Sequence, residues 1–140
     1  MAKHFAITVT KKLKALGEIT MRLFIPVPPL SINAAFQGRR FKTKESKVYD
    51  MAVSNAIQRI APLVSPVKAD WYEVHYQFYV NNFKMSDVDN LIKQTQDCIV
   101  RTGLISDDRR IKRITVEKFQ SAEGAPAGTF VEILPYLREN

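Results

Sequence analysis

A short acidic segment lies inside an otherwise basic chain. Asp87 and Asp89 are two residues apart, Lys93 follows Asp89 by one helical turn, and Asp107 and Asp108 come next to each other further on. Carboxylates this close in sequence repel one another unless a cation or a proton neutralises them. The whole chain has 140 residues, a formal charge of +7 and a pI of about 9.6. The segment therefore predicts a metal site that acts on a polyanion.

The spacing of the first two aspartates suits a shared ligand. In extended backbone the side chains of residues i and i+2 share a face, so Asp87 and Asp89 can reach one cation. A structural alternative is that Asp87 is a helix N-cap and Asp89 a first-turn charge. Lys93 lies on the same helical face as Asp89, where an ammonium group can stabilise a transition state or protonate a leaving oxygen. We expect Asp97 to position Lys93.

The second acidic pair contributes a third carboxylate. Adjacent residues in an extended chain point to opposite faces, so either Asp107 or Asp108 joins the site, and the spacing does not say which. Three carboxylates and water suit Mg²⁺ or Mn²⁺, and the lack of His or Cys at this spacing argues against zinc. Such an ion on a phosphodiester activates water and stabilises the attacking and leaving oxygens. We expect the three carboxylates to converge on one magnesium pocket.

Basic residues flank the acidic segment on both sides in sequence. A solvated charged face is the alternative, but the flanking arrangement favours contacts with a phosphate backbone. The predicted DNA-binding residues are Arg39, Arg40, Lys42, Lys44, Arg109 and Arg110.

Composition indicates one domain with a substantial core. Hydrophobic residues make up 46% of the chain, and no apolar run approaches the roughly 20 residues of a membrane span. Cys98 is the single cysteine, so we expect a buried thiol, no disulfide and a reducing cytoplasm. Residues 1–20 form an N-terminal extension, either an extra strand or a basic arm, ahead of the main domain at 21–140.

Periodicity predicts the elements that position these residues. We expect strands at 21–27, 71–80, 111–120 and 128–134, of which 71–80 alternates most regularly, with His75 on its polar side. The segment 26–42 reads as an irregular loop.

Two helices complete the pattern. Helical spacing covers 43–60, with Val48, Ala52, Ala56 and Ile60 on the inner stripe, and a second helix runs from 88 or 89 to 102 and stops at Gly103. The element order predicts an α/β fold, a small mixed β-sheet with two main helices packed on it.

The motifs resemble one known family. The run DVDNLIK at 87–93, an aspartate four residues after its lysine and GLISDD at 103–108 resemble the RusA family of Holliday-junction resolvases. The upstream stretch FIPVPP at 24–29 and the helix start at 43–49 are also similar, and the resemblance spans residues 21–134.

The resemblance implies a residue-level site. It makes Asp87, Asp89 and Asp108 metal ligands, with Asp108 chosen over Asp107, and Lys93 the catalytic lysine. It implies Mg²⁺, with Mn²⁺ as a substitute, and a homodimer that nicks a four-way junction symmetrically. It also implies roles in DNA recombination and repair and a bacterial or prophage origin.

Two other functions fit the same residues. A non-catalytic phage DNA-binding or regulatory dimer would use the basic clusters, although it has no reason to keep repelling carboxylates that face DNA. A nuclease for flaps or other branched DNA would use the same local chemistry.

Overall fold

A mixed four-stranded sheet forms the centre of the molecule. The computed structural model describes residues 20–30, 36–37, 41–63, 67–85 and 87–137. The sheet order is β1-β6-β4-β5, built from β1 (Met21–Ile25), β6 (Gly128–Pro135), β4 (Tyr72–Val80) and β5 (Ile111–Gln120). The β1–β6 and β6–β4 pairs are antiparallel, whereas β4 and β5 run parallel.

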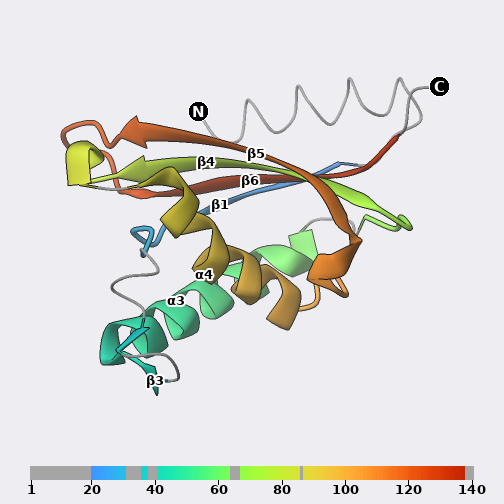
Figure 1. Cartoon of the computed structure of the whole chain (residues 1–140), viewed down its shortest axis with the longest axis horizontal. Coiled ribbons are helices and arrows are strands. Elements are labelled where there is room, and N and C mark those ends of the chain that lie inside the picture. Colours follow the sequence, from blue (N-terminus) through green and yellow to red (C-terminus); the bar gives the residue numbers. More distant parts are fainter. Residues whose placement is uncertain (1–19, 31–35, 38–40, 64–66, 86, 138–140) are drawn as a thin grey trace.

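Two helices cover one face of this sheet (Figure 1). They are α3 (Lys44–Ile60) and α4 (Val88–Arg101), which also pack against each other. Along β4 every second residue, from Tyr72 to Val80, is buried under the helices. Alternation of this kind is what one buried face requires of a strand. The predicted α/β class, with two helices on a small mixed sheet, is confirmed.

The parallel pairing of β4 and β5 dictates the path of the chain. Tyr72 is level with Ile111 at one end of the pair, and Val80 is level with Gln120 at the other. Parallel neighbours need a crossover, so the chain leaves the end of β4 through η2 (Phe83–Met85) and returns along α4. It then enters β5 through η3 (Asp108–Arg110).

The inner stripe of α3 differs from the prediction. Its buried residues are Ser46, Tyr49, Val53 and Ile57, and Val48 is 62% exposed. The predicted stripe was therefore wrong at Val48, although Ala56 and Ile60 still pack against the core. A polar contact explains why the buried face of α3 includes position 49 and not position 48. The buried hydroxyl of Tyr49 lies 2.7 Å from Thr95 Oγ1 of α4, so a tyrosine can occupy a core position with its hydroxyl paired.

The segment predicted to be an irregular loop is partly paired. It contains β2 (Phe36–Gln37) and β3 (Phe41–Lys42), which form a separate two-stranded sheet. The N-terminal extension falls almost wholly outside the described residues, so its boundary at residue 20 stays a prediction.

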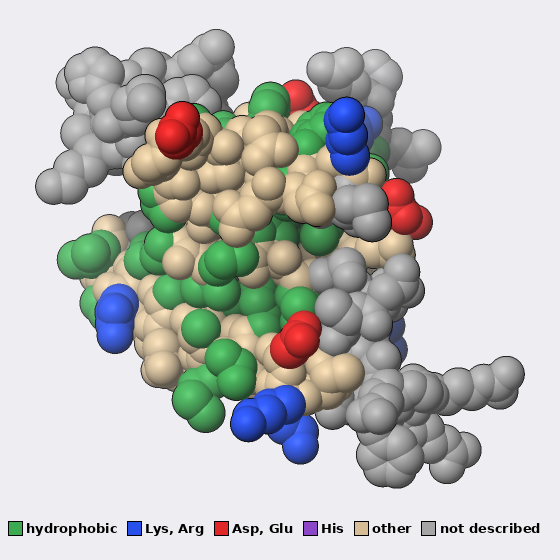
Figure 2. Space-filling view, turned by 90° about the vertical axis from the view of Figure 1, so that its left-hand side faces the viewer, with side chains coloured by type: hydrophobic (Ala, Val, Ile, Leu, Met, Phe, Trp, Pro, Cys, Tyr) green, Lys and Arg blue, Asp and Glu red, His purple; other side chains and the backbone are tan. Residues whose placement is uncertain are grey.

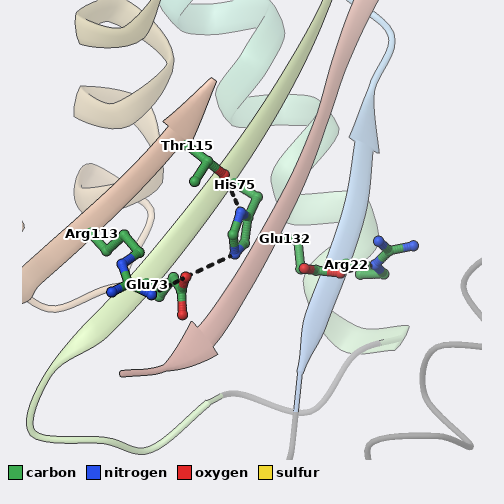
Figure 3. Close-up of polar contacts among 6 residues, drawn as sticks. All are labelled: Arg22, Glu73, His75, Arg113, Thr115 and Glu132. Carbon is green, nitrogen blue, oxygen red and sulfur yellow. Dashed lines mark hydrogen bonds and ion pairs between the residues drawn. The ribbon is translucent and has the colours of Figure 1, made fainter. Parts of the chain in front are cut away.

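The sheet face away from the helices carries charged side chains (Figure 3). His75 lies there, as predicted, between Thr115 Oγ1 at Nδ1 and Glu73 Oε1, which is 3.4 Å from Nε2. Arg113 of β5 also reaches Glu73 Oε1, at 3.4 Å. These contacts connect β4 to β5 across the polar face. Within the described part of the chain, no helix is both long and apolar enough to cross a membrane.

Candidate active site

Asp87 and Asp89 lie at the exposed start of α4. Asp87 has the backbone conformation of an N-cap, with φ −82° and ψ 129°, but its side chain makes no cap hydrogen bond. Instead, one carboxylate oxygen accepts a long 3.5 Å bond from the Asn90 amide. The N-cap alternative thus explains the backbone conformation of Asp87 but gives no role to its carboxylate. Both acids are exposed at the N-terminal end of α4.

Lys93 lies one turn further along the exposed side of α4. Its ammonium group is 3.2 Å from Asp97 Oδ2, the contact predicted from the i, i+4 spacing. Surface ion pairs of this kind add little to stability, so the effect of this one is to fix the position of the Lys93 ammonium. Asp97 holds the ammonium on the face of α4 that also carries Asp89.

Asp107 and Asp108 are distinguished by their contacts. The side chain of Asp107 accepts from the Arg109 amide at 2.9 Å and from its guanidinium at 2.7 and 3.0 Å. These hydrogen bonds, led by the guanidinium, hold the pKa of Asp107 well below its usual range. Asp108, the first residue of η3, is exposed. Asp107 is therefore committed to shaping the turn, and Asp108 is the better placed of the two to bind a ligand.

The structure places Asp108 far from the other two acids. Asp87 and Asp89 start α4 and Asp108 follows its end, and fourteen helical residues span about 21 Å. Figure 1 shows the same separation, with α4 running from the tip of β4 to the start of β5. Among the residues that the structure describes, no group of three or more His, Cys, Asp or Glu side chains could hold a metal ion. Convergence of the three carboxylates within one chain, which we expected, is not observed.

The end of the molecule that holds the start of α4 is shown in Figure 2. Hydrophobic side chains gather across its middle, and charged side chains lie around them. Phe83 of η2 and Val88 of α4 contribute exposed apolar surface near Asp87. Among the described residues, the acids at this end therefore lie next to exposed apolar side chains.

The predicted DNA-binding residues divide between the two ends. Lys44 is the exposed first residue of α3, and Arg109 and Arg110 are exposed in η3 beside Asp108. Arg39 and Arg40 lie outside the described residues, and Lys42 is described only as part of β3.

Sequence reasoning missed one exposed aromatic residue, Trp71. It precedes the buried Tyr72 and lies beside Lys112, whose ammonium is 4.4 Å from the centre of the indole ring. The signal was present in the alternation of β4, because a residue next to a buried one points to the opposite face.

Comparison with known protein families identifies the domain. A protein-family model described as endodeoxyribonuclease RusA matches residues 26–134. The matched range runs from directly after β1 into β6 and includes every predicted catalytic and metal-binding residue. No curated protein matches the chain.

Proposed function

The chain belongs to the RusA endodeoxyribonuclease family, and on that premise we propose that it is a Mg²⁺-dependent endonuclease that resolves four-way DNA junctions by paired, symmetric nicks. Action on branched DNA junctions is the activity of the family. The observation that carries the proposal for this chain is the start of α4. There, Asp87 and Asp89 are exposed, the Asp87 side chain is not used as a cap, and Lys93 follows one turn later.

The donor chemistry fits a hard divalent cation. Asp87, Asp89 and Asp108 offer carboxylate oxygens and exposed positions that leave room for water, as Mg²⁺ prefers. When bound, the ion would supply Lewis-acid activation of a water molecule and neutralise charge on the phosphate. Lys93 would place its ammonium, oriented by Asp97, against the phosphate oxygens, where it offsets negative charge or gives a proton to the leaving oxygen.

We propose further that each site is shared between two copies of the chain. In one copy, about 18 Å of helix separates Asp89 from Arg101, the last residue of α4, and Asp108 follows that end in η3. A rigid α-helix cannot close that distance. A two-fold symmetric dimer can place Asp108 of one copy beside Asp87 and Asp89 of the other, twice. Two equivalent sites in one dimer also suit two nicks at symmetric positions of a junction.

The outer strand of the sheet is the surface on which we expect the second copy to pair. β5 is ten residues long, pairs with β4 on one side and forms the edge of the described sheet. Ile114, on the helix-facing side of this edge, is 39% exposed. Exposed edge strands of this length readily accept another strand.

The sequence of β5 is complementary to itself when two copies run antiparallel. With Thr115 opposite its own copy, Arg113 lies opposite Glu117 and Ile114 lies opposite Val116, each pair occurring twice. Arg113 and Glu117 share one sheet face, and Ile114 and Val116 share the other, as their register against β4 requires. Opposite charges and apolar side chains in directly facing positions each contribute roughly 0.2–1 kcal/mol.

One facing pair in this register brings two lysines together, and each lysine already has a contact within its own chain. Lys112 would face Lys118 of the second copy. Lys112, however, lies over the Trp71 ring, and the Lys118 ammonium donates to the carbonyl oxygen of Phe83 at 2.7 Å. The repulsion is therefore reduced.

This pairing would also bring Asp108 of one copy close to Asp87 and Asp89 of the other. The start of β5, which carries η3 and Asp108, would lie beside the end of β5 in the second copy. That end is level with the end of β4, from which η2 leads into α4. Asp108 and the Asp87–Asp89 pair of the other copy would then occupy the same end of the joined sheet.

A non-catalytic DNA-binding dimer is the second candidate, favoured by the lack of a three-acid group among the described residues of one chain. Cleavage of a labelled mobile four-way junction with Mg²⁺ separates the two. We expect the wild-type protein to cut, Asp89→Asn to lose cleavage and keep junction binding, and Glu123→Gln, the same change at an exposed turn acid, to match wild type. Equal cutting by all three, or binding without any cutting, contradicts the proposed activity.

A further inference from the structure

An exposed tryptophan marks the end of the sheet that carries Asp108. Trp71 directly precedes β4 and is 45% exposed, although the next residue, Tyr72, is buried. Tyr72 is level with Ile111, the residue after η3, so Trp71 lies at the same end as Asp108. A large aromatic ring left this open is characteristic of a binding surface, because its apolar area gains most from being covered.

Cations surround this ring. The Lys112 ammonium lies 4.4 Å from the Trp71 ring centre, and the guanidinium of Arg113 is 5.3 Å from the ring centre of Tyr136. Arg110 reaches back to the carbonyl oxygen of Asp70, the residue before Trp71, at 3.5 Å. The side chain of Arg109 is 88% exposed. Two aromatic rings are thus interleaved with four basic side chains.

Four acids lie among these four cations. Asp107 is bound by Arg109, and Glu73 contacts both Arg113 and His75. Asp70 and Asp108 remain as exposed carboxylates. Acids and cations are therefore equal in number here, so the local charge does not select the partner by itself. We take a polyanion as the ligand from the proposed function and from the formal charge of +7 of the whole chain.

The ring is mounted on rigid backbone. The amide of Tyr136 donates to the carbonyl oxygen of Trp71 at 2.8 Å, which ties the end of β6 to the start of β4. The hydroxyl of the neighbouring Tyr72 donates to the carbonyl oxygen of Val67 at 3.0 Å. Because the backbone that carries the ring is held in this way, little backbone entropy is lost when a ligand covers the ring.

We propose that Trp71 is a stacking platform for an unpaired nucleobase at the branch point of the DNA, with Arg109, Arg110 and Lys112 holding the adjoining phosphates. The inference rests on the proposed function in taking DNA as the ligand, and it names the feature of that DNA that is recognised. Every base has a π face, so stacking tolerates any sequence, but a base inside an intact duplex has no free face to offer. Trp71 therefore selects branched or single-stranded DNA over duplex.

Trp71 is the single tryptophan of the chain, so its fluorescence reports on this site alone. The protein is titrated without Mg²⁺, to prevent cleavage, with a four-way junction carrying unpaired bases at its centre, with a single strand and with a matched duplex. We expect quenching by the junction and the single strand and little change with the duplex. The binding of fluorescein-labelled copies of each DNA is followed by anisotropy in parallel.

Variants separate stacking from charge. We expect Trp71→Ala to weaken junction binding on the order of ten- to a hundred-fold, with an unchanged salt dependence. Trp71→Phe should keep most of the affinity, and it serves as the test if Trp71→Ala does not fold. Lys112→Ala should instead flatten the slope of log affinity against log salt by about one unit. Met51→Ala is the control, because Met51 is a 68% exposed apolar residue on α3, a helix that contributes none of the residues of this surface. It should bind like wild type.

Three results overturn the inference. Saturable junction binding with no change in Trp71 emission leaves the proposed function standing and removes the stacking platform. Emission that shifts with protein concentration in the absence of DNA assigns the ring to contact with a second copy of the chain. Failure to bind any DNA contradicts the proposed function, and the stacking platform with it.

Discussion

Asp89 lies in the first turn of α4 and Asp108 follows the other end of this helix, which is about 21 Å long. The parallel pairing of β4 and β5 makes this separation unavoidable, because the crossover must carry the chain from the end of one strand back to the start of the next. A site that needs both residues must therefore draw them from two chains.

Mixing two inactive variants tests the shared site. Asp89→Asn and Asp108→Asn should each abolish junction cleavage. In a mixed dimer, one site combines both substitutions and the other combines neither, so cleavage returns. Random exchange at equal concentrations should restore about one quarter of the wild-type sites. The product should be a single nick, because each mixed dimer has one intact site. Denaturing gels with both continuous strands labelled measure it.

The control for this mixing is a pair of variants from one half of the site. Asp87→Asn mixed with Asp89→Asn leaves every shared site with at least one substitution, so no cleavage should return. If the Asp89→Asn and Asp108→Asn mixture also stays inactive after exchange is verified, the site lies within one chain.

A charge exchange tests the pairing of β5. Arg113→Glu puts a carboxylate opposite Glu117 of the second copy, so the dimer should dissociate more readily, by roughly ten-fold for two altered pairs. Adding Glu117→Arg restores opposite charges and should restore the dimer. Sedimentation equilibrium measures both. Loss of the Arg113 contact with Glu73 occurs in both variants, so it cannot account for a recovery.

Thr115→Cys gives an independent measure of the register. Facing residues at the two-fold axis lie close enough for a disulfide, so mild oxidation should cross-link the dimer through position 115. Glu123→Cys, in the β5–β6 turn, should give no specific cross-link. Efficient linkage at 123 and none at 115 would assign the dimer to another surface.

The buried amide of Gln94 predicts a stabilising substitution. Gln94 is fully buried on α4, and neither polar atom of its side chain has a hydrogen-bond partner in the described part of the chain. Gln94→Met should therefore raise the free energy of unfolding by about 1 kcal/mol. Urea unfolding followed by circular dichroism measures the change.

Its neighbour Thr95 is the matched control. Thr95→Val removes the partner of the Tyr49 hydroxyl, which would remain buried and unpaired, so stability should fall by about 1–2 kcal/mol. If Gln94→Met destabilises the protein instead, an internal water molecule satisfies that amide.

Cys98 should be unreactive in the native protein. Burial raises the pKa of its thiol to about 12, and the carboxylate of Asp50, 3.6 Å from Sγ, adds to the shift. At pH 8 the thiolate fraction is then about one in ten thousand, so Ellman's reagent should react after denaturation and not before. Fast reaction of the native protein would place the sulfur at the surface.

The same shift sets a pH dependence of stability. The folded pKa is above the reference value of 9.0, so the neutral thiol contributes stability below pH 9, and this contribution is lost as the pH rises towards 12. Cys98→Ala should lessen the fall in melting temperature over this range.

Local pattern predicted much of the fold. The alternation of β4, the strand at 111–120 and the helix ending at Gly103 depend on neighbouring residues, and the structure agrees with each. Gly103 has φ +86°, a conformation that glycine adopts without strain, which explains its place as the helix stop. The α3 stripe was misjudged at Val48 because the burial of Tyr49 depends on Thr95 of another helix.

The geometry of the site could not be predicted in the same way. Spacing placed Lys93 beside Asp97, a contact within one helix, and the structure shows it. The distance from Asp89 to Asp108 depends instead on whether β4 and β5 run parallel, which no local pattern states. The metal-binding and catalytic roles of these residues stay predictions.

The junction between η3 and β5 has a mechanical consequence. Arg110 ends η3 and Ile111 begins β5, so only the two arginines of η3 separate Asp108 from the strand. Any sliding of one β5 along the other is transmitted to that carboxylate in full, and a two-residue slip moves it by about 7 Å. The register between the two β5 strands would thus set the position of Asp108 in the active site. Inserting two glycines after Arg110 should preserve dimer assembly and reduce DNA cleavage.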